Sequence, residues 1–170
     1  AEFASAYHAL GSDVVLISSR DRVLPGEDPD AAKVLEDVFI ERGLTVMDNS
    51  RAQSARVEGD GVVVTLADGT DITGSHVLMA VGSLPNVEEL GLDTAGVELD
   101  DRGFIKVDRV SRTTARGVYA AGDVTGVLML ASVAAMQGRI AMWHALGDAV
   151  QPIDLNTVSS AVFTDPEIAT

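Results

Sequence analysis

The sequence predicts an α/β fold, and three observations support this. Apolar runs at residues 14–17 and 44–47 flank a helix-like stretch that begins at Asp28-Pro29, as in a parallel strand, helix, strand unit. From residue 55 the apolar period changes to two, which indicates antiparallel strands. A long apolar helix is expected at 128–146.

The composition narrows the class of protein. The chain has 170 residues, 46% of them apolar, and a formal net charge of −14. These values exclude intrinsic disorder and argue against nucleic-acid binding or a polybasic membrane contact. With no Cys, these residues hold no disulfide scaffold, thiolate zinc site or cysteine nucleophile, and the three His are too scattered for a metal site. Polar side chains within 128–146 make a membrane span improbable.

The first elements follow from local signals. Phe3, Tyr7 and Leu10 have helical spacing, and Gly11 is a suitable C-terminal cap. Residues 14–17 form an apolar run typical of a buried parallel strand. The next helix begins with a capping carboxylate and a proline at its first position, and it ends at Gly43. Its expected apolar face comprises Ala31, Val34, Leu35 and Val38.

The middle of the chain predicts a hairpin meander. Turns at Gly59-Asp60-Gly61 and Asp68-Gly69 divide residues 55–73 into three short strands. A buried strand is expected at 76–80, and Pro85 soon afterwards cannot continue it.

The second half predicts strands at 104–107 and 117–123, then the helix at 128–146. Pro152 marks a boundary, and residues 161–163 are strand-like. Because the first helix lacks a cap and the last strand lacks a partner, we expect an internal piece of a longer protein.

The segment GVYAAGDVTG, residues 117–126, carries the most chemical information. An acid at the carboxyl end of a strand, after a glycine and before a helix, lies where open α/β sheets bind ligands. Gly122 permits close approach, Asp123 can accept from hydroxyl groups, and the helix directs N–H groups to the same place. The competing interpretation is that Gly122 and Asp123 only form a turn.

Several segments together resemble one family. They are LMAVGSLPN at 78–86, GFIKVD at 103–108, Thr113-Thr114 with GVYAAGDVTG, and FTDPEIA at 163–169. In order and spacing the chain resembles the FAD-dependent pyridine nucleotide-disulfide oxidoreductases, which include lipoamide dehydrogenase, glutathione reductase and soluble transhydrogenase.

The resemblance implies three parts. Residues 1–82 would form a Rossmann-like NAD(P)H-binding domain with an antiparallel β-meander insertion, incomplete because its glycine loop would precede Ala1. Residues 83–150 would be the closing part of a Rossmann-like FAD-binding domain. Residues 151–170 would begin a dimerisation domain, so a homodimer is expected.

The resemblance also implies ligand contacts. Asp123 would bind the ribityl chain of FAD, with Gly122 allowing the approach, and the helix start at Leu130 and Ala131 would face the flavin. Gly82 would lie at the crossover between the nicotinamide and FAD domains, contacting both cofactors. Glu2 would lie near the nicotinamide, although an ordinary exposed first-turn glutamate is the alternative.

The nucleotide preference follows from the turn after residue 18. NAD sites place an acid at this position, whereas a 2′-phosphate needs cations and small polar groups. Here Ser19 replaces the acid, and Arg20 and Arg22 are near. NADPH is therefore favoured over NADH. In the alternative, both arginines are solvated charges paired with Asp21 or Glu27.

The expected function is hydride transfer from NAD(P)H to FAD and on to an acceptor. Residues 130–141 resemble the soluble transhydrogenase branch, which favours a quinone or similar diffusible acceptor. A dihydrolipoamide dehydrogenase or other disulfide reductase is the alternative, and a redox-sensing FAD/NAD(P)-binding module is an alternative of another class. No catalytic residue is identifiable in this segment, no metal is expected, and a cytoplasmic location is expected.

Overall fold

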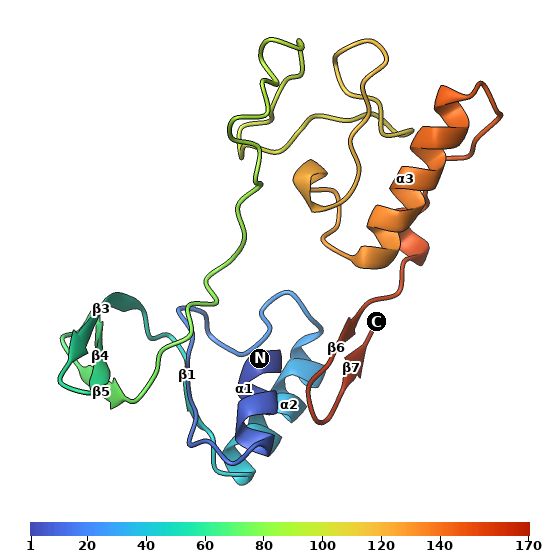
Figure 1. The fold of residues 1–170 in the computed structure, drawn as a ribbon. Helices are drawn as coiled ribbons and strands as arrows, with labels where there is room; N and C mark the ends of the chain where they lie inside the picture. The colour runs from blue at the N-terminus through green and yellow to red at the C-terminus, as the bar shows by residue number, and fades with distance from the viewer. The chain divides into compact units, whose positions relative to one another are not determined.

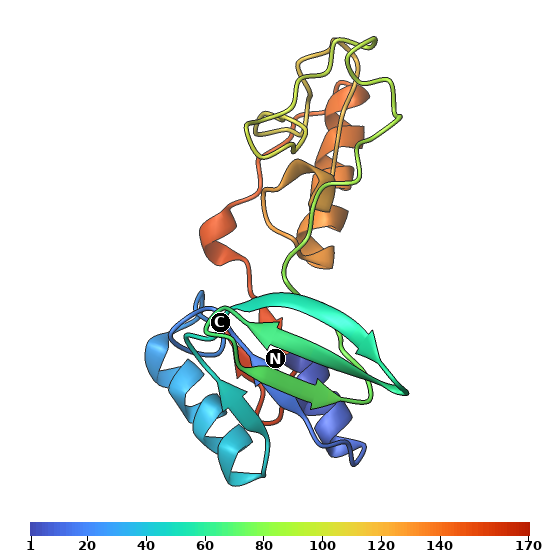
Figure 2. The ribbon, with the colours of Figure 1, turned by 90° about the vertical axis from the view of Figure 1, so that its left-hand side faces the viewer.

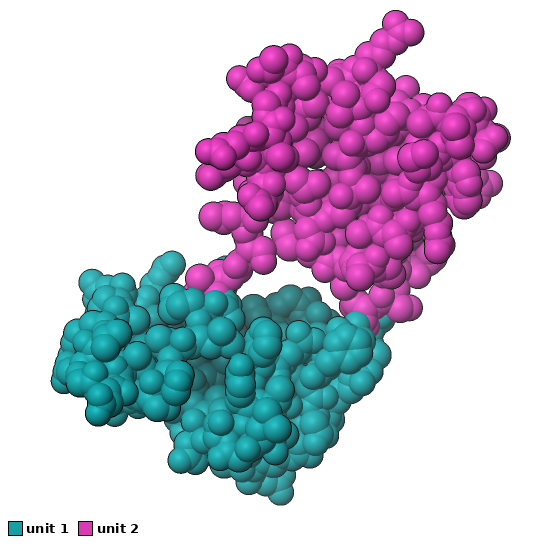
Figure 3. Space-filling view, viewed as in Figure 1, with its two compact units in different colours: residues 1–80, 161–170 teal, residues 81–160 magenta.

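The computed structural model describes residues 1–170, which form two compact units (Figure 3). Unit 1 comprises residues 1–80 and 161–170, and unit 2 comprises residues 81–160. Helices and strands are both present, and the predicted mixed α/β class is confirmed.

Unit 1 contains the predicted parallel unit. Helix α1 (Glu2–Ala9) precedes strand β1 (Val15–Ile17), helix α2 (Pro29–Glu41) and strand β2 (Thr45–Met47) (Figure 1). Strands β1 and β2 pair in parallel, with Val15 opposite Thr45. The sequence placed all four elements to within one or two residues.

Helix α2 begins as expected, and its buried face agrees in part with the predicted one. The Asp28 carboxylate accepts from the N–H groups of Asp30 and Ala31, which caps the helix. The buried residues are Ala32, Leu35 and Phe39, whereas Val34 is 57% exposed. The prediction is therefore confirmed for Leu35 and wrong for Val34, while Ala31 and Val38 are half-buried at the edge of this face. Leu35 and Phe39 pack in the core with Val23, Leu44 and Ile168.

The meander is confirmed. Strands β3 (Ala52–Glu58), β4 (Gly61–Leu66) and β5 (Asp71–Gly74) form an antiparallel sheet in that order (Figure 2). Gly59 and Gly69 have φ of 60° and 89° in the two turns, a region that favours glycine.

The end of the chain returns to unit 1 as a short hairpin. Strands β6 (Ala161–Val162) and β7 (Ile168–Ala169) pair antiparallel, and the Asp165–Pro166 bond between them is cis. The hairpin lies beside α1, where the Ser5 hydroxyl oxygen accepts from the Asp165 N–H at 3.1 Å (Figures 1 and 2).

Unit 2 is mainly irregular chain around one helix, α3 (Ala131–Ala145), with short 3₁₀ turns η1 (Asp123–Thr125) and η2 (Leu155–Thr157). The predicted strands at 104–107 and 117–123 do not form. Only isolated bridges occur there, Leu99 to Ile105 and Arg112 to Tyr119. A strand requires a partner along its whole length, and none of the 170 residues supplies one.

Two further expectations need correction. Residues 76–80 are unpaired and exposed rather than a buried strand, and Leu78 and Met79 expose 56% and 61% of their surface. Helix α3 begins at Ala131 rather than Leu128, because Leu130 is extended (φ −128°, ψ 133°). None of the helices is both long enough and apolar enough to cross a bilayer.

Candidate functional site

The Gly122-Asp123 turn has a backbone that requires glycine. Gly122 has φ 86° and ψ −162°, a region essentially restricted to this residue. A Cβ atom at this position would lie 3.4 Å from Cβ of Ala134, so α3 packs closely against the turn. Asp123 follows on the surface, and its carboxylate makes no hydrogen bond or ion pair within the chain. The turn thus presents a free acceptor.

Two buried polar side chains hold this turn, and sequence reasoning missed both. The Gly122 N–H donates to Oε1 of Gln137 at 2.8 Å, and the Thr125 hydroxyl donates to the Gly122 carbonyl at 2.8 Å. Nε2 of Gln137 donates to Oγ1 of Thr125 at 3.3 Å. The available signal was a lone amide in an apolar helix. Gln137 lies three or four residues from Val133, Ile140 and Ala141, on the buried face of α3.

Phe104 fixes the other end of the turn. Gly126 has φ 63°, and a Cβ atom there would lie 2.6 Å from Cγ of Phe104, which is buried. The Ile105 N–H also donates to the Val124 carbonyl at 2.9 Å. Residues 122–126 are therefore held from two directions by packing and by backbone hydrogen bonds.

The start of α3 is open. Leu130 occupies the N-cap position without a side-chain cap hydrogen bond, and the first turn has no acidic residue. The predicted contacts Leu130 and Ala131 thus lie at a helix end whose N–H groups and positive dipole end remain available to an acceptor atom.

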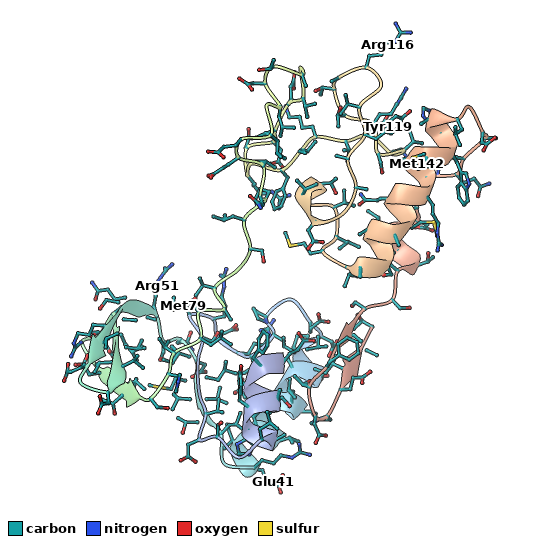
Figure 4. All side chains as sticks on the ribbon, viewed as in Figure 1. Glu41, Arg51, Met79, Arg116, Tyr119 and Met142 are labelled. Atoms are coloured by element: carbon teal, nitrogen blue, oxygen red, sulfur yellow. The ribbon has the colours of Figure 1, made fainter.

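A second tether joins the chain before Gly122 to the other end of α3. Tyr119, labelled in Figure 4, lies beside α3. Its Oη is 2.7 Å from Nδ1 of His144, and both side chains are partly buried. The two residues connect the 117–121 segment to the last turn of the helix.

The nucleotide candidates of unit 1 lie in one turn at the carboxyl end of β1. Backbone hydrogen bonds join this turn to the loop after β2: the Asn49 N–H donates to the Arg20 carbonyl at 2.7 Å, and the Ser50 N–H donates to the Ser18 carbonyl at 2.8 Å. Ser19 and Arg20 are exposed. In open α/β sheets, ligands commonly bind at the carboxyl ends of the strands, which is where this turn lies.

The two arginines differ. Nη1 of Arg22 lies 3.1 Å from the Asp21 carboxylate, and Nη2 donates to the Pro25 carbonyl at 3.4 Å. This pairing is the alternative expected from the sequence. The Arg20 guanidinium has no partner within the chain, so of the two it is the cation available to a ligand.

Glu2 and Gly82 have distinct surroundings. Oε1 of Glu2 accepts from the Phe163 N–H at 2.9 Å, so one carboxylate oxygen already binds the residue that follows β6. Gly82 is exposed with φ 121°, and a Cβ atom there would contact nothing within 4 Å. Within unit 1 the structure brings Ser19, Arg20 and Arg22 into one turn; within unit 2 it brings Gly122 and Asp123 against α3.

Relatives of known sequence extend these observations. The chain is 57% identical over 169 residues to an NAD(P)H dehydrogenase (quinone) of Mycobacterium tuberculosis strain H37Rv, covering 99% of the chain and 34% of the relative. It is 39% identical to a dihydrolipoyl dehydrogenase of Chlamydia muridarum, covering 99% of the chain and 36% of the relative. The chain therefore spans about a third of the length of the curated relatives it matches.

Solved structures of similar proteins match the fold of the chain. The crystal structure of LpdA from Mycobacterium tuberculosis matches 99% of the chain and 37% of its own length, with a TM-score of 0.94 at 57% identity. The HOCl-induced flavoprotein disulfide reductase RclA from Escherichia coli matches 98% of the chain and 38% of its own length, with a TM-score of 0.90 at 27% identity. The family described as pyridine nucleotide-disulphide oxidoreductase matches residues 1–138. The chain belongs to this family.

Proposed function

We propose that the full-length protein is a flavoprotein oxidoreductase that takes electrons from NAD(P)H through FAD to a quinone. The observation that carries the proposal is the free Asp123 carboxylate, which follows a positive-φ glycine and precedes an uncapped helix. The name of the Mycobacterium tuberculosis relative, at 57% identity, supports the choice of a quinone.

The residues of unit 2 fit FAD. The exposed Asp123 carboxylate is suited to accept hydrogen bonds from ribityl hydroxyl groups. The open N-terminus of α3, at Leu130 and Ala131, is suited to a flavin edge that gains negative charge. When bound, FAD would supply the two-electron chemistry, accepting a hydride from the nicotinamide and reducing the acceptor. The residues of the chain would bind FAD and orient it.

The proposal assigns a role to each part of the chain. Residues 1–82 are the NAD(P)H-binding part, with a Rossmann-like parallel unit and the meander as an insertion. Residues 83–150 are the closing part of a Rossmann-like FAD domain. Residues 151–170 begin the dimerisation domain of a homodimer. Gly82 is the crossover between the first two parts, and Glu2 orients the nicotinamide with the carboxylate oxygen that Phe163 leaves free.

NADPH is the proposed electron donor. Ser19 leaves room where an acid would repel a phosphate, and the unpaired Arg20 guanidinium can bind it in a bidentate manner. Arg22 contributes less because Asp21 neutralises part of its charge.

The donor preference is testable by Arg20→Ala in the full-length protein. Loss of a charge-assisted hydrogen bond worth about 1.5–3 kcal/mol should raise the KM for NADPH roughly 10- to 100-fold and leave the KM for NADH nearly unchanged. Arg116→Ala is the matched control, because Arg116 is an exposed arginine of unit 2 at the tip of a loop (Figure 4). Equal effects of Arg20→Ala on the two nucleotides would refute the phosphate contact.

The reductase activity is testable by anaerobic stopped-flow mixing of the full-length flavoprotein with NADPH. Flavin absorbance should bleach and then return on addition of a benzoquinone. If neither NADPH nor NADH bleaches the flavin, the protein is not a reductase, and the redox-sensing module becomes the better interpretation. Return of absorbance with oxidised lipoamide but not with the quinone would favour the disulfide reductase function that the names of the Chlamydia and Escherichia coli relatives describe.

A further inference from the structure

Three polar groups close a hydrogen-bonded ring beneath the Gly122-Asp123 turn. Gln137 is 4% exposed and Thr125 is 7% exposed. The Gly122 N–H binds the amide oxygen of Gln137, the amide nitrogen of Gln137 binds the hydroxyl oxygen of Thr125, and this hydroxyl donates to the Gly122 carbonyl. Both polar groups of the Gly122 residue are thereby paired with buried side chains.

Packing alone does not explain a glutamine at this position. Its neighbours on the buried face of α3 are Val133, Ile140 and Ala141. A buried amide is unfavourable unless its hydrogen bonds are made, and an apolar side chain would fill the same face without this cost. Leucine could not make the hydrogen bonds of Gln137 to Gly122 and Thr125, so these bonds point to a role in fixing the shape of the turn.

The ring acts on a glycine, Gly122, which directly precedes Asp123. Because glycine has no Cβ atom, sterics alone do not hold it at φ 86° and ψ −162°. Its N–H is bonded to Gln137 of α3, and its carbonyl accepts from both the hydroxyl and the N–H of Thr125, so hydrogen bonds hold it in one orientation. The direction of the Asp123 backbone is set in this way.

We propose that Gln137 is a positioning residue for flavin binding, acting with Thr125 through Gly122 to present the Asp123 carboxylate to the ribityl hydroxyl groups. The inference rests on the proposed function, in which Asp123 binds FAD. Gln137 is buried behind the turn, and it acts on the cofactor only through the backbone it holds.

The main test is Gln137→Leu in the full-length protein, with flavin affinity and steady-state kinetics measured together. We expect the Kd for FAD to rise about tenfold or more, since one buried donor loses its partner. The flavin spectrum should shift and kcat should fall, while the KM for NADPH, which binds in unit 1, should stay unchanged. Hydrogen exchange of peptides spanning 117–126 should accelerate. Gln53→Leu, at an exposed glutamine of β3, should change none of these quantities.

Two conservative substitutions of Thr125 distinguish loss of the hydrogen bond from a general folding defect. Thr125→Ser keeps the hydroxyl and should retain flavin affinity, whereas Thr125→Val keeps the shape and should lose it as Gln137→Leu does. Because both residues belong to one ring, the double variant Gln137→Leu/Thr125→Val should weaken FAD binding less than the product of the single effects. Multiplicative effects, or equal affinities for Thr125→Ser and Thr125→Val, would overturn the inference.

Asp123→Ala separates this inference from the proposed function. If Asp123→Ala weakens FAD binding and Gln137→Leu does not, the positioning role is wrong and the flavin site stands. If Asp123→Ala leaves the Kd for FAD unchanged, the flavin contact is wrong and the positioning role falls with it. Loss of affinity in both variants, with the KM for NADPH unchanged in Gln137→Leu, supports both.

Discussion

Unit 1 and unit 2 are stabilised in different ways. In unit 1 regular helices and strands surround an apolar cluster of Val23, Leu35, Phe39, Leu44 and Ile168. In unit 2 long irregular segments run beside one helix, and side-chain to backbone hydrogen bonds fix their turns. Unit 2 also buries apolar side chains, among them Phe104, Val133 and Ile140, but it orders its chain with turns rather than with paired strands.

In two turns of unit 2, an aspartate carboxylate accepts hydrogen bonds from backbone N–H groups a few residues later. Oδ1 of Asp100 accepts from the N–H groups of Arg102 and Phe104, and Oδ1 of Asp108 accepts from those of Val110 and Arg112. Each carboxylate closes a short turn without a strand partner. The Gly122 turn of the candidate site is held in a similar way, by the side chain of the buried Gln137. Unit 2 therefore gains precise turns without a continuous sheet.

We expect the largest loss of stability from a substitution in the core of unit 1. Phe39 is 1% exposed at the centre of the cluster, so Phe39→Ala should lower the free energy of unfolding by about 3–5 kcal/mol. Denaturant titration of the full-length protein measures this value. Val34→Ala, one turn away on the exposed face, should stay within about 0.5 kcal/mol of the parent. Similar losses for the two variants would contradict the assigned face of α2.

In unit 2 we expect the largest loss of stability from a substitution of Gly126. Gly126→Ala would combine an unfavourable φ of 63° with a Cβ atom 2.6 Å from the buried Phe104 ring, and the expected loss is about 1–3 kcal/mol. Gly147→Ala is the matched control, with φ 86° and no atom within 4 Å, so only the backbone term of about 1 kcal/mol remains. Thermal unfolding of both variants distinguishes packing from backbone strain.

The same contrast explains what the sequence could predict. Helix caps, apolar runs and Gly-Asp turns are local signals, and they located α1, β1, α2, β2 and the meander of unit 1. The strands expected at 76–80, 104–107 and 117–123 had equally apolar sequences but lacked partners, which no local pattern reveals. The apolar pattern of α2 predicted the buried Leu35 but also included Val34, which is exposed, and it left out the buried Phe39.

The candidate site shows the same division. Motif order predicts Gly122 and Asp123 as site residues, from their residue types and from a turn before a helix, and this stays a prediction. Gln137 was visible in the sequence only as a polar residue in an apolar helix. Its role depends on a hydrogen bond to a residue 15 positions earlier. The difference between Arg20 and Arg22 likewise depends on the Asp21 ion pair, since both side chains can bind phosphate.

A smaller effect should follow loss of the α2 cap. The Asp28 carboxylate satisfies two first-turn N–H groups, so Asp28→Ala should lower the free energy of unfolding by about 1 kcal/mol. Asp28→Ser keeps a capping oxygen and should recover most of this loss. Circular dichroism during thermal unfolding measures both. A full loss in Asp28→Ser would mean that charge near the helix end, rather than the hydrogen bond, stabilises α2.

The smallest expected effect tests the polar turns of unit 2 by pH. The Phe104 N–H, then that of Arg102 and the Arg102 charge, hold the pKa of Asp100 below its ordinary value of 3.8. A carboxyl group whose pKa is lower in the folded state stabilises the protein above its unfolded-state pKa, and this contribution disappears as pH falls through the lower, folded-state value.

Asp100→Asn keeps an oxygen acceptor but removes the charge, so its Tm should lie slightly below that of the parent at neutral pH. The difference should shrink below pH 3.8 and vanish once the parent carboxyl group is protonated. Asp101→Asn, next in sequence but without these backbone hydrogen bonds, should show no such dependence. A Tm difference for Asp100→Asn that persists at the lowest pH would show that the shape of the amide, and not the loss of charge, weakens the turn.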